Sequence, residues 1–119
     1  MPRVLIVDDA AFMRNMIREI LTKNGFEVVG EASNGNEAIR LFEELKPDLV
    51  TMDIVMPMKS GIEATRELAS RHPGVNIVIC SALGQETLVM EAMDVGAKDF
   101  IVKPFKEEQV LAICRRVMA

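Results

Sequence analysis

The sequence predicts a single α/β domain, built on a five-stranded parallel sheet with helices on both faces. Two patterns indicate this. Short apolar runs rich in Val and Ile recur five times along the 119 residues, and three are apolar almost throughout, as is typical of strands covered on both faces. A segment with helical spacing of apolar residues follows each run. This alternation implies right-handed crossovers and a doubly wound sheet.

The five apolar runs are the expected strands. The second run, EVVGEA, is the least apolar, which indicates a strand at an edge of the sheet. No composition shift or linker separates the runs, so we expect one domain over residues 1–119. The expected strands occupy residues 4–7, 27–32, 48–53, 76–80 and 99–103.

Five amphipathic segments are the expected helices, and Gly or Pro follows each of the first four. Three glycines, Gly61, Gly84 and Gly96, are expected at turns or helix caps with positive φ. The apolar positions that define the helices are, in chain order, Phe12, Met13, Met16, Ile17, Ile20 and Leu21; Ala38, Leu41, Phe42 and Leu45; Ile62, Thr65, Leu68 and Ala69; Leu88, Val89, Ala92 and Met93; and Val110, Ile113, Cys114 and Val117.

Composition excludes several classes of protein. A hydrophobic fraction of 50% excludes intrinsic disorder. A net charge of −4 and a pI near 5.0 argue against nucleic acid as a partner of this domain. No apolar stretch approaches the roughly 20 residues of a membrane span, and Cys80 and Cys114 are expected to be buried free thiols. We therefore expect a soluble, cytoplasmic protein. We also expect it to be a monomer.

Polar residues gather where the expected strands end. In doubly wound sheets the ligand site lies beyond the carboxyl ends of the strands. Asp8 and Asp9 follow the first strand, Asp53 ends the third, Ser81 follows the fourth and Lys103 ends the fifth. An Asp is also a good helix N-cap, so one of the first pair is a candidate cap for the helix that follows.

These residue types suit a phosphoryl site. Clustered carboxylates repel one another and need a cation, and their hard oxygens suit Mg²⁺. Lys103 alone does not neutralise three acids, whereas a divalent ion together with Lys103 nearly does. Phosphoryl transfer depends on such positioning and charge neutralisation, and an Asp carboxylate can itself be the nucleophile. Asp53 stands alone at the end of a central strand, so we assign it that role.

Four segments resemble the receiver domains of two-component signalling, and the likeness is closest to the single-domain chemotaxis response regulators. The resemblance covers the chain from Arg3 to the last helix. It implies a flavodoxin-like fold with strand order 2-1-3-4-5 and five helices, an order that periodicity alone does not supply. The matching segments are VLIVDDAAFMR (4–14), MDIVMPMKSG (52–61), SALG (81–84) and KDFIVKPF (98–105).

The resemblance implies a role for each site residue. Asp53 corresponds to the phosphoacceptor, and a sensor histidine kinase supplies the phosphoryl group. The implied Mg²⁺ ligands are Asp9, Asp53 and the backbone carbonyl of Val55, while Asp8 holds a metal-bound water. The remaining implied roles are phosphoryl binding by Ser81, the amide of Ala82 and Lys103, a conformational switch formed by Ser81 and Phe100, and a cis peptide bond between Lys103 and Pro104.

The resemblance implies a phosphoacceptor switch rather than a metabolic enzyme. Such a domain itself catalyses its phosphorylation and its autodephosphorylation. The implied output surface comprises the fourth helix, the fifth strand and the fifth helix. Its expected partner is a protein such as the flagellar motor switch or a chemotaxis phosphatase. Alternatively, the chain is the receiver part of a larger regulator with a DNA-binding or methylesterase output.

Two unrelated functions fit the sequence less well. A Mg²⁺-dependent phosphohydrolase that forms an aspartyl phosphate usually carries an acid two residues after its nucleophile, and Val55 occupies that position here. Flavin binding requires a Ser/Thr-rich phosphate loop after the first strand and flanking aromatic residues. The chain has no such loop, no Trp and no Tyr.

Overall fold

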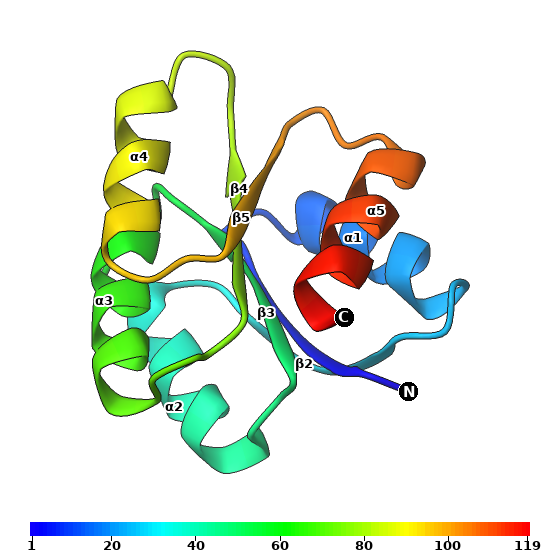
Figure 1. Ribbon diagram of the computed structural model, residues 1–119, viewed down its shortest axis with the longest axis horizontal. Coiled ribbons are helices and arrows are strands. Elements are labelled where there is room, and N and C mark those ends of the chain that lie inside the picture. The colour runs from blue at the N-terminus through cyan, green and yellow to red at the C-terminus, as the bar shows by residue number, and fades with distance from the viewer.

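Five parallel strands lie at the centre of the protein in the order β2-β1-β3-β4-β5 (Figure 1). The computed structural model describes residues 1–119, and the sheet confirms both the predicted class and the implied strand order. The strands are β1 (Arg3–Val7), β2 (Glu27–Ala32), β3 (Leu49–Asp53), β4 (Ile77–Ser81) and β5 (Asp99–Val102). The helices are α1 (Ala11–Thr22), α2 (Gly35–Leu45), α3 (Gly61–Arg71), α4 (Glu86–Asp94) and α5 (Glu107–Met118).

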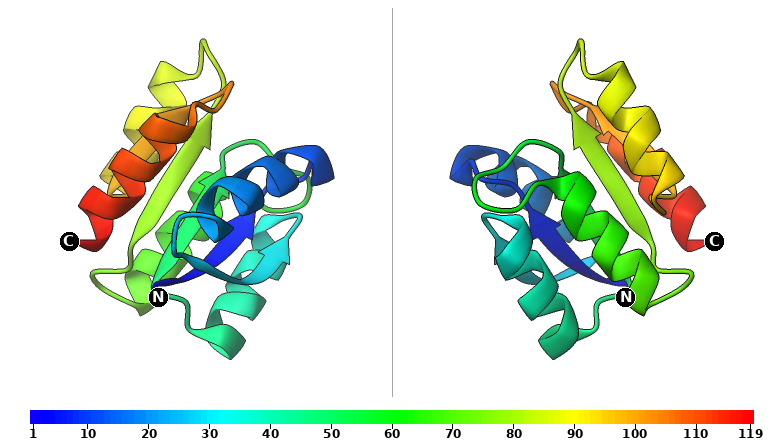
Figure 2. Two further views of the ribbon diagram at one scale, coloured as in Figure 1. Left: turned by 90° about the vertical axis from the view of Figure 1, so that its right-hand side faces the viewer. Right: turned by 90° about the vertical axis from the view of Figure 1, so that its left-hand side faces the viewer.

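Helices cover both faces of the sheet. α2, α3 and α4 lie on one face and α1 and α5 on the other (Figures 1 and 2). Two hydrophobic cores result, with 18 buried residues beneath the first group of helices and 12 beneath the second. Successive strand residues point into opposite cores, so every residue of β3 and β4 is buried. This is why those runs are apolar without alternation.

The edge position predicted for the second strand is confirmed. Only Ala32 of β2 is buried. Its pairing with β1 also slips by one residue between Val4 and Leu5. A strand with one neighbour and partial cover needs fewer apolar side chains, which explains the weak signal of this run.

The helices α2 and α3 begin with side-chain caps, whereas α1 does not. Asn34 accepts a hydrogen bond from the Glu37 amide at the start of α2, and Ser60 forms a capping box with Glu63 at the start of α3. The cap position of α1 is Ala10, which has no side-chain cap. The interpretation of an Asp cap is therefore wrong, since the Asp residues precede that position.

Two other sequence expectations need correction. Phe12 was expected on the buried stripe of the first helix, but it is 74% exposed. The buried residues of α1 are Ile17 and Leu21, which lie on roughly the opposite side of the helix from Phe12. Gly61 has no positive φ, although Gly84 and Gly96 do.

Both cysteines are buried free thiols, as predicted. Burial raises the pKa of Cys80 and of Cys114, so both stay protonated at neutral pH. None of the five helices combines the length and the apolar character that crossing a membrane requires.

Candidate functional site

The parallel sheet brings the ends of four strands to one edge. Asp53 is the last residue of β3 and Ser81 the last of β4, while Asp8 follows β1 directly and Lys103 follows β5 directly. The register fixes their neighbours, because Val7 pairs with Met52 and Asp53 pairs with Cys80. Side chains that lie far apart in the sequence therefore meet at the carboxyl edge.

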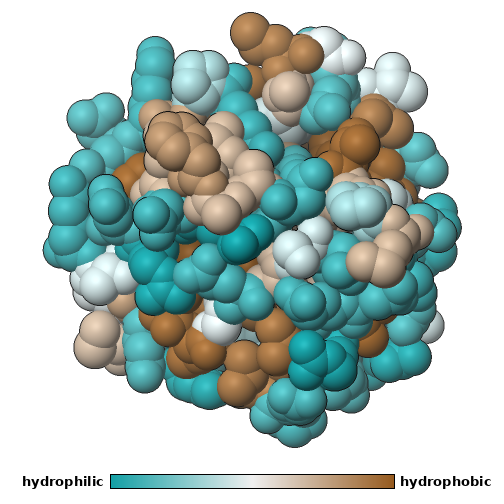
Figure 3. Space-filling model, turned by 180° about the vertical axis from the view of Figure 1, so that it is seen from behind, coloured by the Kyte–Doolittle hydropathy of each residue, from teal (hydrophilic) through white to brown (hydrophobic).

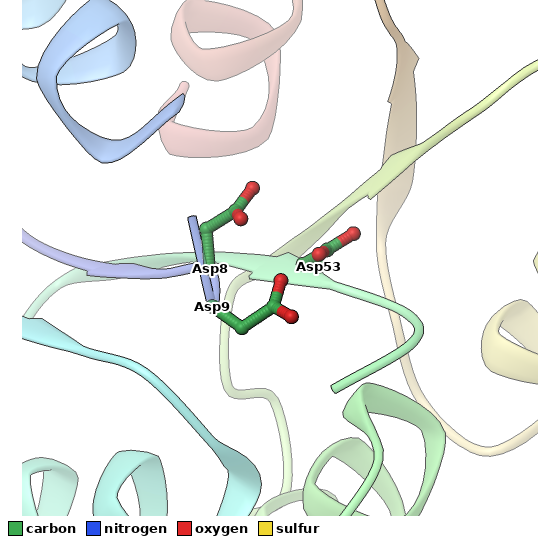
Figure 4. A group of neighbouring side chains, drawn as sticks. All are labelled: Asp8, Asp9 and Asp53. Atoms are coloured by element: carbon green, nitrogen blue, oxygen red, sulfur yellow. The ribbon is translucent and has the colours of Figure 1, made fainter. Parts of the chain in front are cut away.

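The three acidic residues form one cluster. Carboxylate oxygens of Asp8, Asp9 and Asp53 lie within 4.8 Å of one another (Figure 4). Asp8 and Asp53 are buried, at 4% and 7% exposure, while Asp9 is exposed. The cluster thus has two acids in the protein interior and one at its mouth.

Lys103 bridges the two buried acids. Its Nζ lies 3.1 Å from Oδ2 of Asp8 and 3.2 Å from Oδ1 of Asp53. Burial alone would lower the pKa of Lys103, but the contacts with Asp8 and Asp53 outweigh burial and raise it. Lys103 therefore remains charged at neutral pH. The Lys103-Pro104 peptide bond that follows is cis.

The ionised form of Asp53 remains destabilised even though Lys103 lies beside it. Burial and the neighbouring Asp8 raise its pKa from 3.8 to about 6, against the opposing effect of Lys103. Both hydrogen bonds to its carboxylate, from Lys103 and from the Ile54 amide, end on Oδ1. Oδ2 is the oxygen that remains for another partner.

The donor set fits a divalent metal ion. Three carboxylates against one ammonium leave two uncompensated negative charges when all are ionised. Hard oxygen donors of this kind suit Mg²⁺ better than a soft transition metal. The raised pKa of Asp53 indicates the same need for positive charge. The cluster can therefore hold a divalent cation between β1 and β3.

The end of β4 carries the polar groups beside the acids. Ser81 is 1% exposed. The amide of Ala82, which was expected to bind a phosphoryl oxygen, donates to Oε1 of Gln85 at 2.7 Å. The role of Gln85 was not predicted from the sequence. Neither its residue type nor its position after Ser81 indicates this contact.

A cavity of about 200 Å³ lies between α4 and β5 beside Ser81. Six of its eight lining residues are hydrophobic, and Phe100 and Val89 are among them. Phe100 is 40% exposed, so its ring lies at the border of this cavity rather than in the core.

Gly61 has a role that was not predicted from the sequence. A Cβ atom there would lie 1.9 Å from the carbonyl oxygen of Asp53. The Gly61 amide donates to the carbonyl of Ile54 at 2.8 Å. Glycine thus lets α3 begin directly against the end of β3, which fixes the backbone of Asp53 and of the loop after it.

Exposed apolar side chains lie in the segments that follow β1, β3 and β4. Figure 3 shows, from behind, hydrophobic groups in the upper and in the lower part of the surface. The large apolar residues that are exposed in the loops or at the start of α1 are Phe12, Val55, Met58 and Leu83. Exposed apolar side chains thus share these loops with the acids and with Ser81.

Comparisons with known proteins agree with this geometry. The model of the response regulator receiver domain family matches residues 4–115. The chain is 56% identical to the chemotaxis protein CheY of Thermotoga maritima over 115 residues, which cover 97% of this chain and 96% of that protein. It is 53% identical to the chemotaxis protein CheY of Bacillus subtilis over 116 residues, covering 98% and 97%.

A solved structure has the same fold. The CheX–CheY–BeF3–Mg²⁺ complex from Borrelia burgdorferi contains a chain that superposes with a TM-score of 0.93 at 35% identity. The match covers 98% of this chain and 89% of that one.

Proposed function

The chain belongs to the response regulator receiver domain family, and from this premise we propose that residues 1–119 form one receiver domain that is switched by phosphorylation of Asp53. The observation that carries the proposal is the geometry of Asp53. It ends a buried central strand within a cluster of three carboxylates, and Lys103 lies 3.2 Å from it.

In the proposed reaction Asp53 is the nucleophile toward a phosphohistidine of a sensor histidine kinase. Oδ2 of Asp53, which accepts no hydrogen bond within the protein, attacks the phosphorus atom. The P–N bond to the imidazole breaks and its electron pair returns to the nitrogen. With a proton already on the other ring nitrogen of the phosphohistidine, this gives an acyl phosphate on Asp53 and a neutral histidine on the kinase. Lys103 stabilises the negative charge that gathers on the phosphoryl oxygens.

We propose that Asp9, Asp53 and the backbone carbonyl of Val55 bind Mg²⁺ directly and that Asp8 holds a metal-bound water. The hard oxygens of the acidic cluster support this assignment. Bound Mg²⁺ supplies the charge neutralisation that phosphoryl transfer requires. Autodephosphorylation of Asp53 in the same site completes the proposed cycle, so the chain acts as a self-catalysed switch.

The proposed switch involves Ser81 and Phe100. A phosphoryl group adds about −1.5 to −2 charges at neutral pH, and the hydroxyl of Ser81 and the amide of Ala82 are the nearby donors. Movement of Ser81 toward the phosphoryl group would let the ring of Phe100 enter the adjoining cavity of about 200 Å³. This would change the surface of α4, β5 and α5, the proposed output surface.

We propose that this output is chemotactic, since both CheY relatives carry that name and the match extends over nearly their whole length. The proposed partner is a protein such as the flagellar motor switch or a chemotaxis phosphatase. A receiver of a larger regulator, with a DNA-binding or methylesterase output, is the alternative. Pull-downs with beryllofluoride-treated and untreated protein distinguish the two by what the treated form captures.

Phosphorylation by acetyl phosphate with Mg²⁺ tests the central proposal. Intact-mass analysis should show one added phosphoryl group on the parent protein and none on Asp53→Asn. Asp94→Asn is the matched control, because Asp94 is an exposed acid at the end of α4. Full labelling of Asp53→Asn would remove Asp53 from its proposed role.

A further inference from the structure

The loop between β4 and α4 is closed by a side-chain hydrogen bond. The Ala82 amide donates to Oε1 of Gln85 at 2.7 Å. Gly84 has a φ of +88°, a conformation that glycine adopts without strain. The chain thus turns within the few residues between the end of β4 and the start of α4, and the Gln85 side chain folds back to its beginning.

This use of Gln85 leaves α4 without a cap. Gln85 occupies the cap position of α4, yet its side chain accepts no hydrogen bond from the helix. At the starts of α2 and α3 the corresponding side chains, those of Asn34 and Ser60, do accept one. The carboxamide of Gln85 is therefore committed to the loop rather than to the helix that it precedes.

The Ala82 amide has two competing acceptors. It is the donor proposed above for a phosphoryl oxygen, and in this structure Oε1 of Gln85 already accepts from it. One N–H group does not serve both acceptors at full strength. A phosphoryl oxygen carries negative charge and is the stronger acceptor, so it would displace the neutral carboxamide.

We propose that Gln85 is an internal competitor of the phosphoryl group, occupying the Ala82 amide in the unphosphorylated protein and leaving it when Asp53 is phosphorylated. The proposal rests on the proposed function and adds a regulatory residue to it. Ala82, Leu83 and Gly84 are exposed, so this loop can rearrange without disturbing the core.

The exchange would connect the site to the output surface. Once released, the Gln85 carboxamide lies directly before the first turn of α4, whose amides lack a side-chain acceptor. Val89, one turn further on, is buried and holds the rest of the helix against the sheet. Phosphorylation would thereby change the N-terminus of α4 while leaving its middle in place.

The variant Gln85→Met tests this competition, because Met keeps the length of the side chain and lacks a strong acceptor. Beryllofluoride with saturating Mg²⁺ serves as the phosphoryl analogue, and binding is followed by amide NMR spectra. One net hydrogen bond corresponds to an affinity change of about three- to tenfold. We expect Gln85→Met to bind beryllofluoride tighter by that factor, with the affinity for Mg²⁺ alone changed less than about twofold.

Gln109→Met is the matched control, since Gln109 is an exposed glutamine on α5. The Ala82 amide resonance provides a second readout, and it should move upfield in free Gln85→Met as the hydrogen bond is lost. A gain in affinity is not an effect that general structural damage produces. Gln85→Glu, whose charged acceptor strengthens the contact, should bind beryllofluoride more weakly than the parent.

Unchanged or weaker binding of beryllofluoride by Gln85→Met would overturn the proposal. If Gln85→Met does not fold, the result for Gln85→Glu decides: weaker binding supports the competition, and unchanged or tighter binding overturns it. Failure of the proposed function has a different signature. In that case the parent protein itself would neither bind beryllofluoride nor be phosphorylated on Asp53.

Discussion

The charge of Asp53 should destabilise the metal-free protein at neutral pH. In the unfolded chain this carboxylate is fully hydrated, whereas in the fold it is buried beside Asp8 and its pKa rises from 3.8 to about 6. The folded state therefore binds the proton more tightly than the unfolded state does. The stability that this gives is fully present below pH 3.8 and is lost as the pH rises through about 6.

Asp53→Asn removes this penalty, so it should raise the free energy of unfolding. A shift of roughly two pH units at 1.36 kcal/mol each corresponds to about 3 kcal/mol, and screening by the solvent that reaches the site reduces this to about 1–2 kcal/mol. The Asn carbonyl oxygen can still accept from Lys103 and from the Ile54 amide, both of which donate to Oδ1. Lys103 also keeps its contact with Asp8.

Urea titration followed by far-ultraviolet circular dichroism measures the effect, since the chain has no Trp or Tyr for intrinsic fluorescence. At pH 7.5 with a chelator, Asp53→Asn should be more stable than the parent, and the difference should shrink as the pH falls through about 6. Mg²⁺ should reverse the order, because saturation to 100 times its Kd adds about 2.7 kcal/mol to a protein that binds it.

Asp94→Asn removes the same charge from an exposed position and should change the free energy of unfolding by less than about 0.5 kcal/mol. If Asp53→Asn is no more stable than the parent in chelator at pH 7.5, the account of the acidic cluster is wrong. An advantage that persists undiminished at pH 4 would also contradict it.

Three further substitutions test the structure outside the cluster. Thr65→Val should stabilise by about 1 kcal/mol, because the Thr65 hydroxyl is fully buried without a partner; a loss in a urea titration would contradict this. Ser60→Ala should cost about 1 kcal/mol through loss of the α3 capping box, and an unchanged urea midpoint would argue against that cap. Glu31→Gln should cost about 1 kcal/mol at pH 7. Burial would raise the pKa of Glu31, but Arg18 and Arg14 outweigh it and lower that pKa. The loss should therefore disappear as the pH falls below 4.5, and a loss that is constant with pH would count against the ion pairs.

Periodicity alone predicted most of the fold. Strands covered on both faces have a strong signal, and β3 and β4 match their runs to within a residue. The strand order was predicted only from the resemblance, because the sequence of an apolar run does not indicate which strand it pairs with. Phe12 shows the limit of helical spacing: α1 is apolar on two sides, and only contact with the sheet decides that Ile17 and Leu21 are the buried pair.

The site was predictable to the extent that it depends on strand ends. Asp8, Asp53 and Lys103 meet because the carboxyl ends of parallel strands lie at one edge of the sheet. The positions of these strand ends were predictable from the apolar runs. Gln85 acts through a turn of the loop, in which its side chain accepts a hydrogen bond of 2.7 Å from the Ala82 amide. Gly61 acts through the close approach of its backbone to the carbonyl of Asp53. Neither a residue type nor a spacing reports such contacts in advance.

The energetics of the proposed switch follow from an exchange of partners rather than from new contacts alone. A phosphoryl group would gain Ser81, the Ala82 amide and Lys103, and each charge-assisted hydrogen bond contributes about 1.5–3 kcal/mol. Against this, Lys103 gives up part of its contact with Asp53, and the amide leaves Gln85. A net gain of about 2–8 kcal/mol remains on these magnitudes, and moving an equilibrium from 1:99 to 99:1 requires about 5.5 kcal/mol. An internal competitor such as Gln85 matters on this scale, because one neutral hydrogen bond of about 0.5–1.5 kcal/mol changes the ratio of the two states by about two- to tenfold.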